Sequence, residues 1–170
     1  MRGSCSLQHG QNAANVLGQL SKALSSHEKH ASKIMDLAFQ SIFAGQDAEK
    51  NLRAINTALS KNGKHAQSFF DLANRSFKEK QDAARNVFAA NNAIMDHYGK
   101  KKRLRDKTEE TLFGRNAGHV FKYANWAIDG GENAAGKLRD YNPSASKMDF
   151  VTQRWRKGFQ AGVSKIKKRF

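Results

Sequence analysis

Few residues of this chain are spaced in a way that could carry chemistry. His27 and His30 lie three residues apart on a predicted helix, a spacing at which two imidazoles can bind one metal ion. No third ligand is marked, since the neighbouring Glu28 points to another side of that helix. The stretch Asp129-Gly130-Gly131-Glu132 lacks phosphate-loop spacing, and no nucleophile motif is present. We therefore predict a chain that is not an enzyme and that needs no metal or cofactor.

Positive charge is the strongest signal in the sequence. Among 170 residues, 30 lysines and arginines stand against 15 aspartates and glutamates, which gives a formal net charge of +15. Such an excess predicts a polyanionic neighbour, and nucleic acid, an anionic membrane surface and an acidic protein are all open. The predicted polyanion-binding residues form a cluster after Gly99 and one face of a C-terminal helix: Lys100, Lys101, Lys102, Arg103, Arg105, Lys107, Arg154, Arg156, Lys157, Lys165, Lys167, Lys168 and Arg169.

These cations are expected to contact phosphates without reading sequence. No zinc-finger, RNA-recognition or helix-turn-helix signature accompanies them. For the cluster, a nuclear localisation patch or a solvated linker is the alternative interpretation. The C-terminal helix also has an apolar face, on which Trp155 and Phe159 are the expected interface anchors. That pattern is typical of a helix at a membrane surface, of one docked on a partner, or of one folded back on the bundle.

The elements that must position these charges are helices. From Leu17 to Tyr98, apolar residues recur in steps of three and four, and the single proline of the chain is Pro143. This spacing predicts helix throughout, interrupted only near Gly45 and Gly63. The predicted helix-seam residues are Leu52, Ile55, Leu59, Phe70, Phe77, Val87 and Ile94. A narrow seam favours a partner helix, from this chain in an ordinary bundle or from a second copy.

We therefore predict an all-α fold of long, interrupted amphipathic helices in an extended bundle or an oligomeric ring or tube. The expected divisions are an N-terminal arm (1–11), a long helical assembly region (12–98), a basic linker (99–107), a helix (108–128), a Gly/Asn-containing linker that holds at most a short helical turn (129–145), and a basic amphipathic helix (146–170). No solenoid-type repeat is predicted. Cys5, the one cysteine, leaves no internal disulfide and indicates a reducing compartment.

Residues 10–98 resemble, in composition and helical pattern, the small internal virion or ejection proteins of short-tailed bacteriophages. The resemblance rests on proline-free stretches rich in Ala, Gln and Asn (QNAANVLGQL, QDAEKNLRAINTALSK, KEKQDAARNVFAANNAIM), an early lone cysteine and a basic C-terminus. It implies a chain kept in the virion interior that assembles with its own copies and other virion proteins into a helical conduit for DNA across the host cell envelope. The alternative is a cytoplasmic helical protein that binds nucleic acid without sequence preference.

Overall fold

The computed structural model describes residues 3–98, 117–143 and 155. Within these ranges the chain is helical and contains no strand, which confirms the all-α prediction. The helices are α1 (Gly3–Ser26), α2 (Ala31–Phe43), α3 (Ala48–Asn62), α4 (Ala66–Lys78), α5 (Ala83–Tyr98), α7 (Gly118–Asp129) and α8 (Ala134–Arg139). Single 3₁₀ turns at Glu28–His30 and Gly63–His65 lead into α2 and α4.

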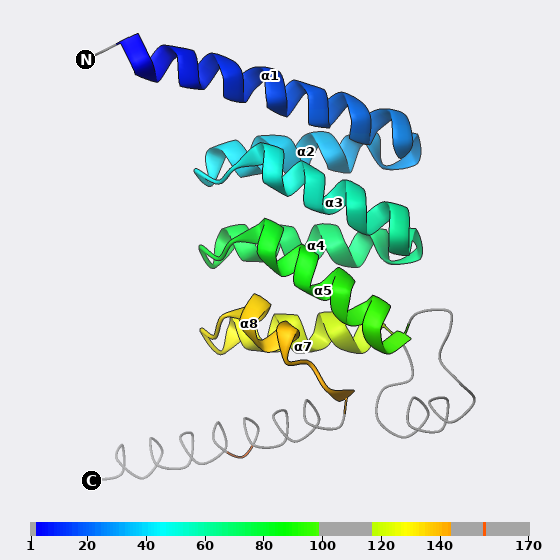
Figure 1. The fold of residues 1–170 in the computed structure, drawn as a ribbon. Helices are drawn as coiled ribbons and strands as arrows, with labels where there is room; N and C mark the ends of the chain where they lie inside the picture. Colours follow the sequence, from blue (N-terminus) through cyan, green and yellow to red (C-terminus); the bar gives the residue numbers. More distant parts are fainter. Residues whose placement is uncertain (1–2, 99–116, 144–154, 156–170) are drawn as a thin grey trace, which may run out of the picture.

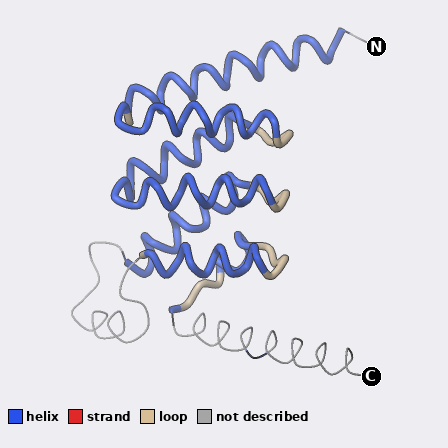
Figure 2. The backbone as a smooth tube through the Cα atoms, turned by 180° about the vertical axis from the view of Figure 1, so that it is seen from behind, coloured by secondary structure: helices blue, strands red, loops and turns tan. Residues whose placement is uncertain are grey.

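The helices form a stack of antiparallel hairpins, α2–α3, α4–α5 and α7–α8, with α1 at one end (Figure 1). One row of contacts runs through α1, α3, α5 and α8, and a second row runs through α2, α4 and α7. The same two-row order is visible from behind (Figure 2). Among the described residues, each hairpin packs mainly against its neighbours in the chain, and this is the architecture of an α-solenoid. We call these elements the stack.

The hairpins repeat one sequence pattern. At a spacing of 35 residues, His30-Ala31, Leu37-Ala38, Ser41, Gln46-Asp47-Ala48 and Asn51 recur as His65-Ala66, Leu72-Ala73, Ser76, Gln81-Asp82-Ala83 and Asn86. At a spacing of 51 residues, Ala66, Phe70, Ala73, Asn74 and Ala83 recur as Ala117, Phe121, Ala124, Asn125 and Ala134. The prediction that the chain has no solenoid repeat is therefore wrong. The repeat is carried by small and polar residues, which a search for apolar spacing passes over.

Each hairpin turn uses one left-handed residue followed by one helix cap. The left-handed residues are Gly45, Lys80 and Gly131, with φ of +65°, +54° and +71°. Two residues later a side-chain oxygen accepts a hydrogen bond from the first turn of the next helix, as Asp47 does from the Lys50 N–H at 3.1 Å. Asp82 and Asn133 make the same cap one and two hairpins further on. The predicted break near Gly45 is this turn.

The helical region breaks at more places than predicted. Beyond Gly45 and Gly63, it also breaks at His27–His30 and at Glu79–Asp82. The sequence does not predict the break at Glu79–Asp82, because its left-handed residue is Lys80. A lysine seldom takes this conformation, whereas a glycine adopts it freely and would indicate a turn.

Three predicted divisions change as well. Residues 3–11, predicted as an arm, belong to α1, since an established helix extends at low cost through residues without proline. The predicted linker 129–145 contains α8. Of the predicted helix 108–128, residues 117–128 are described, and α7 begins at Gly118 and ends one residue later than predicted, at Asp129.

The predicted seam is buried inside this one chain. Six of its seven members are buried: Leu52, Ile55, Leu59, Phe70, Val87 and Ile94. Phe77 is half-buried and packs against the same core. Since neighbouring hairpins supply the partner helices, the seam is satisfied without a second copy, as the intramolecular alternative requires.

Substitutions at the left-handed residues Gly45 and Lys80 should change the free energy of unfolding in opposite directions. Gly45→Ala should lower the free energy of unfolding by about 1 kcal/mol, because its φ is unfavourable for a side chain. No atom crowds a Cβ there, so backbone strain is the whole cost. Lys80→Gly should raise the free energy of unfolding by up to about 1 kcal/mol for the converse reason.

Gly63→Ala is the matched control, because Gly63 has a right-handed φ of −56° and equally open surroundings. It should stabilise the chain by about 0.4–1 kcal/mol by restricting the unfolded state. Urea unfolding of the three variants measures the effects. Equal shifts for Gly45→Ala and Gly63→Ala would contradict the assignment.

Candidate functional site

Glutamine side chains join consecutive hairpin turns. The Gln46 Nε2 donates to the Gln81 carbonyl at 2.7 Å, and the Gln46 Oε1 accepts from the Ala83 N–H at 3.1 Å. One hairpin further on, the Gln81 Nε2 donates to the Glu132 carbonyl at 2.8 Å and its Oε1 accepts from the Ala134 N–H at 3.2 Å. Each amide thus satisfies one N–H that the start of a helix leaves unpaired and the carbonyl of the residue before the helix cap. We call this row the turn ladder.

A buried polar pair holds the two helices of each of the first two hairpins together. Ser41 accepts a hydrogen bond from the Asn51 Nδ2 at 3.0 Å while its hydroxyl donates to the Leu37 carbonyl at 2.7 Å. Ser76 accepts from Asn86 in the same way at 2.9 Å. All four side chains are buried, so each would be costly to leave unpaired.

The third hairpin departs from both features. Glu132 takes the place of the ladder glutamine, and its carboxylate pairs with the Lys137 ammonium at 2.8 Å. Lys137 occupies the position of the buried asparagine and lies 5.6 Å above the Trp126 ring. A carboxylate cannot donate to a carbonyl, so within the described residues the turn ladder ends at Glu132.

Removing one ladder amide should uncouple the third hairpin. Gln81→Ala loses both bonds to the next turn, and at about 0.5–1.5 kcal/mol each this should cost about 1–3 kcal/mol of unfolding free energy. Amide exchange in residues 118–139 should rise with it, as hydrogen-exchange mass spectrometry would show.

Gln67→Ala is the matched control, because the exposed Gln67 side chain bonds only to Lys33 and Asp71 side chains. Similar exchange rates for residues 118–139 in the two variants would contradict a coupling role for Gln81.

Histidines occupy the joints between hairpins. The His30 ring lies 6.1 Å from the Phe70 ring, and the His65 ring lies 5.9 Å from the Phe121 ring, centroid to centroid. The Nε2 atoms of both histidines are buried without a hydrogen-bond partner. Burial, and in addition a neighbouring lysine, lowers the pKa of each imidazole below its ordinary value. Both joints are therefore built for the neutral form.

The stack should lose stability when the medium becomes acidic. Because the folded-state pKa values of His30 and His65 lie below the unfolded value near 6.5, the unfolded chain binds protons more strongly. Their contribution is complete above about pH 6.5 and is lost as the pH falls through that value toward the folded pKa. The thermal midpoint should therefore decrease when the pH is lowered from about 7.5 to about 5.

The double variant His30→Gln/His65→Gln should flatten this pH dependence, and His27→Gln serves as a control for loss of a histidine. Thermal unfolding followed by circular dichroism measures each profile. An unchanged slope in the double variant would exclude the joints as its source.

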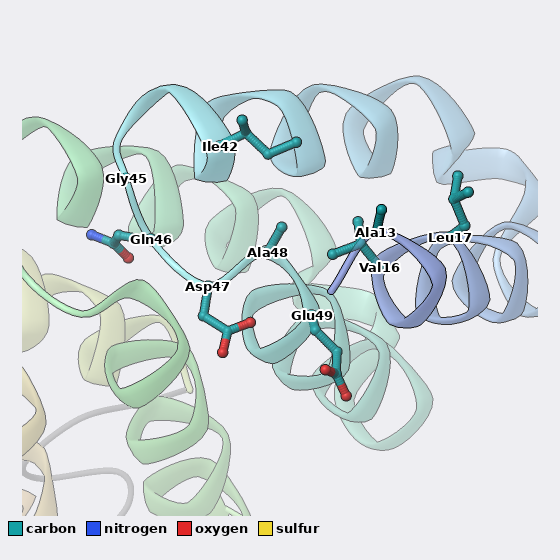
Figure 3. Close-up of a pocket in the computed structure, with 9 residues that line it drawn as sticks. All are labelled: Ala13, Val16, Leu17, Ile42, Gly45, Gln46, Asp47, Ala48 and Glu49. Atoms are coloured by element: carbon teal, nitrogen blue, oxygen red, sulfur yellow. The ribbon is translucent and has the colours of Figure 1, made fainter. Parts of the chain in front are cut away.

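An apolar groove lies at the open end of the stack, before the first turn (Figure 3). It has a volume of about 740 Å³, and its lining residues are Ala13, Val16, Leu17, Ile42, Gly45, Gln46, Asp47, Ala48 and Glu49. Leu17 is 65% exposed and Ile42 is 60% exposed. Leu17 stands 35 residues before Leu52, which is fully buried. The groove therefore exposes positions that later hairpins cover.

The predicted polyanion-binding residues fall outside the part of the chain that the structure describes. The cations of the cluster at 100–107 and of the C-terminal helix, together with Phe159, lie outside the described residues. Trp155 is helical and 76% exposed, but no partner surface is described around it. In the described part of the chain, no group of three metal-binding side chains is found, so His27 and His30 lack a third ligand there.

The repeat spacing locates the first basic segment relative to the stack. Between the second and third hairpins the spacing rises from 35 to 51 residues, an excess of 16 within 99–116. The described residues hold 14 lysines and arginines and 11 aspartates and glutamates, whereas the remainder holds 16 and 4. Most of the net charge is therefore carried by residues that the repeat pattern does not use.

Comparisons with known proteins identify no relative: no family model, no curated protein and no solved structure matches the chain. Among the helices in the described ranges, none combines the length and the apolar character needed to span a bilayer.

Proposed function

We propose that the chain is a non-enzymatic helical-repeat protein that binds the nucleic-acid backbone through its basic segments, residues 99–116 and 144–170. The observation that carries the proposal is the separation of charge from architecture. The stack is close to charge balance, with 14 cationic and 11 anionic side chains, while the other residues hold 16 and 4. The residues outside the described repeats therefore carry +12 of the formal net charge of +15.

The insertion point supports a binding role for the first segment. The turn ladder crosses from the second to the third hairpin with the same two bonds that join the first to the second. The joint histidine makes an equivalent ring contact on both sides. The 16 extra residues therefore leave the stacking unchanged. In repeat proteins, insertions of this kind map to loops on one face, which is often the binding face.

Phosphate binding predicts a definite salt dependence. For wild-type protein, the logarithm of affinity for duplex DNA should fall linearly with the logarithm of salt, by about 0.9 per phosphate contacted. The variant Lys101→Gln/Lys102→Gln/Arg103→Gln should weaken binding to all sequences alike and make the slope shallower by up to about three units. Fluorescence anisotropy over a salt series measures both quantities.

A matched variant removes the same charge from the stack: Lys61→Gln/Lys64→Gln/Lys78→Gln, all three exposed. Its slope should stay near that of the wild type. Equal losses in the two triple variants would show that total charge, and not the inserted segment, sets affinity. Binding to anionic vesicles without binding to DNA would reject the nucleic-acid proposal.

A second candidate function is the virion protein of a conduit, which the resemblance to phage ejection proteins implies. The observation in its favour is the exposed apolar end of the stack, where Leu17, Ile42 and Phe43 are 65%, 60% and 84% exposed. Such a surface suits contact with another copy or another virion protein. Native mass spectrometry at low salt without nucleic acid distinguishes the candidates: a defined ring supports the conduit, and a monomer that coats DNA supports the first proposal.

A further inference from the structure

We infer that the groove at the open end of the stack is a docking site for residues 3–10 of this same chain, folded back along α2 after a turn at residues 10–13. The docked segment would be the last part of one more helix in the row of α2, α4 and α7. This inference concerns the architecture alone and does not depend on the proposed function.

The sequence of residues 6–13 is in register with the two later turns. Ser6-Leu7 and Gly10-Gln11-Asn12-Ala13 stand 35 residues before Ser41-Ile42 and Gly45-Gln46-Asp47-Ala48. The same positions carry Ser76-Phe77 and Lys80-Gln81-Asp82-Ala83 another 35 residues on. Residues 6–13 thus contain every residue type that builds a turn in this stack: the serine and apolar residue of the helix end, the left-handed residue, the ladder amide and the cap.

The first turn also differs from the later turns in one pair of backbone groups. In the second and third turns, the equivalent carbonyl and N–H groups are bonded by the glutamine of the preceding turn. Among the side chains that the structure describes, none bonds the Gln46 carbonyl or the Ala48 N–H. Gln11 stands in the register position from which a ladder amide bonds both.

One face of α2 is exposed where the later helices of its row are covered. In the later hairpins this face meets the preceding helix of the row, since Gln67 of α4 bonds Lys33 of α2. Likewise, Asp129 of α7 forms an ion pair with Arg75 of α4. The residue of α2 in register with Asp129 is Phe43, which is 84% exposed. A phenylalanine at this position favours an apolar cover, which Leu7 and the preceding residues can supply.

In the structure the same segment continues α1 as a straight helix (Figure 1). At about 1.5 Å per residue, residue 5 then lies roughly 12 Å beyond Ala13, away from the first turn. Folding back exchanges the helical bonds across Gly10 for two ladder bonds and an apolar cover. The end of the stack therefore has an open form, which can receive another copy, and a closed form, which cannot.

Cys5 allows a direct test, because it is the only cysteine of the chain. Residue 5 is in register with Arg75, whose partner Asp129 is in register with Phe43, so closure places residue 5 beside residue 43. In the variant Phe43→Cys, a short bismaleimide should therefore join residues 5 and 43 within one chain. Lys78→Cys is the matched control, being the same position one hairpin further on, and should cross-link about tenfold or more slowly.

A second pair of variants ties the cross-link to the ladder. Gln11→Ala in the Phe43→Cys background should lower the intramolecular yield several-fold, whereas Gln8→Ala should leave it unchanged. Circular dichroism verifies that each variant is folded. Cross-linking of Phe43→Cys no faster than Lys78→Cys would overturn the inference, as would a cross-linked dimer in place of the intramolecular product, since a second copy would then be the occupant.

Discussion

The bond between a glutamine amide and the backbone of the next turn is the constraint on which the stack depends. Gln46 and Gln81 each satisfy a carbonyl and an N–H that no helix bond reaches. Because the amide offers one donor and one acceptor, it fixes both the distance and the orientation of the following turn. Apolar packing alone would allow adjacent hairpins to slide, since burial is proportional to area and has no direction.

The rest of the core is arranged around that spacing. Small residues such as Ala58, Ala73 and Ala90, all at most 1% exposed, let helices of adjacent hairpins approach closely. Larger side chains pack between neighbouring helices of a row, as Phe69 of α4 and Phe121 of α7 do with ring centroids 4.9 Å apart at an interplanar angle of 82°. The two joint histidines lie at the opposite ends of the hairpins from the turn ladder. Each hairpin is thus fixed to the next at its turn and at its joint.

The sequence alone predicts the helical class and most of the core, because apolar spacing and the absence of proline are strong signals. It also predicts the turn at Gly45 and the burial of residues such as Leu52 and Ile55. The apolar spacing does not reveal the repeat. The residues that mark it are Gln, Asp, Ser and Asn, and they become informative only when each is compared with the identical residue 35 positions later. Lys80 conceals the second turn for a different reason, because a lysine does not indicate the left-handed conformation that it adopts there. The candidate groove becomes visible only when Leu17 is compared with its buried counterpart Leu52.

The longer connection that raises the repeat spacing from 35 to 51 residues costs little chain entropy. The entropy of closing a connection grows only with the logarithm of its length, so each doubling costs about 0.6 kcal/mol. The ends of this connection are already held together, because the Tyr98 hydroxyl and the His119 ring both bond the Tyr141 hydroxyl, at 3.0 Å and 2.8 Å. Closure of the connection is therefore nearly independent of what it contains. Its length and charge can therefore change over evolution at little cost to the stack, so the segment at residues 99–116 can diverge faster than the helices beside it.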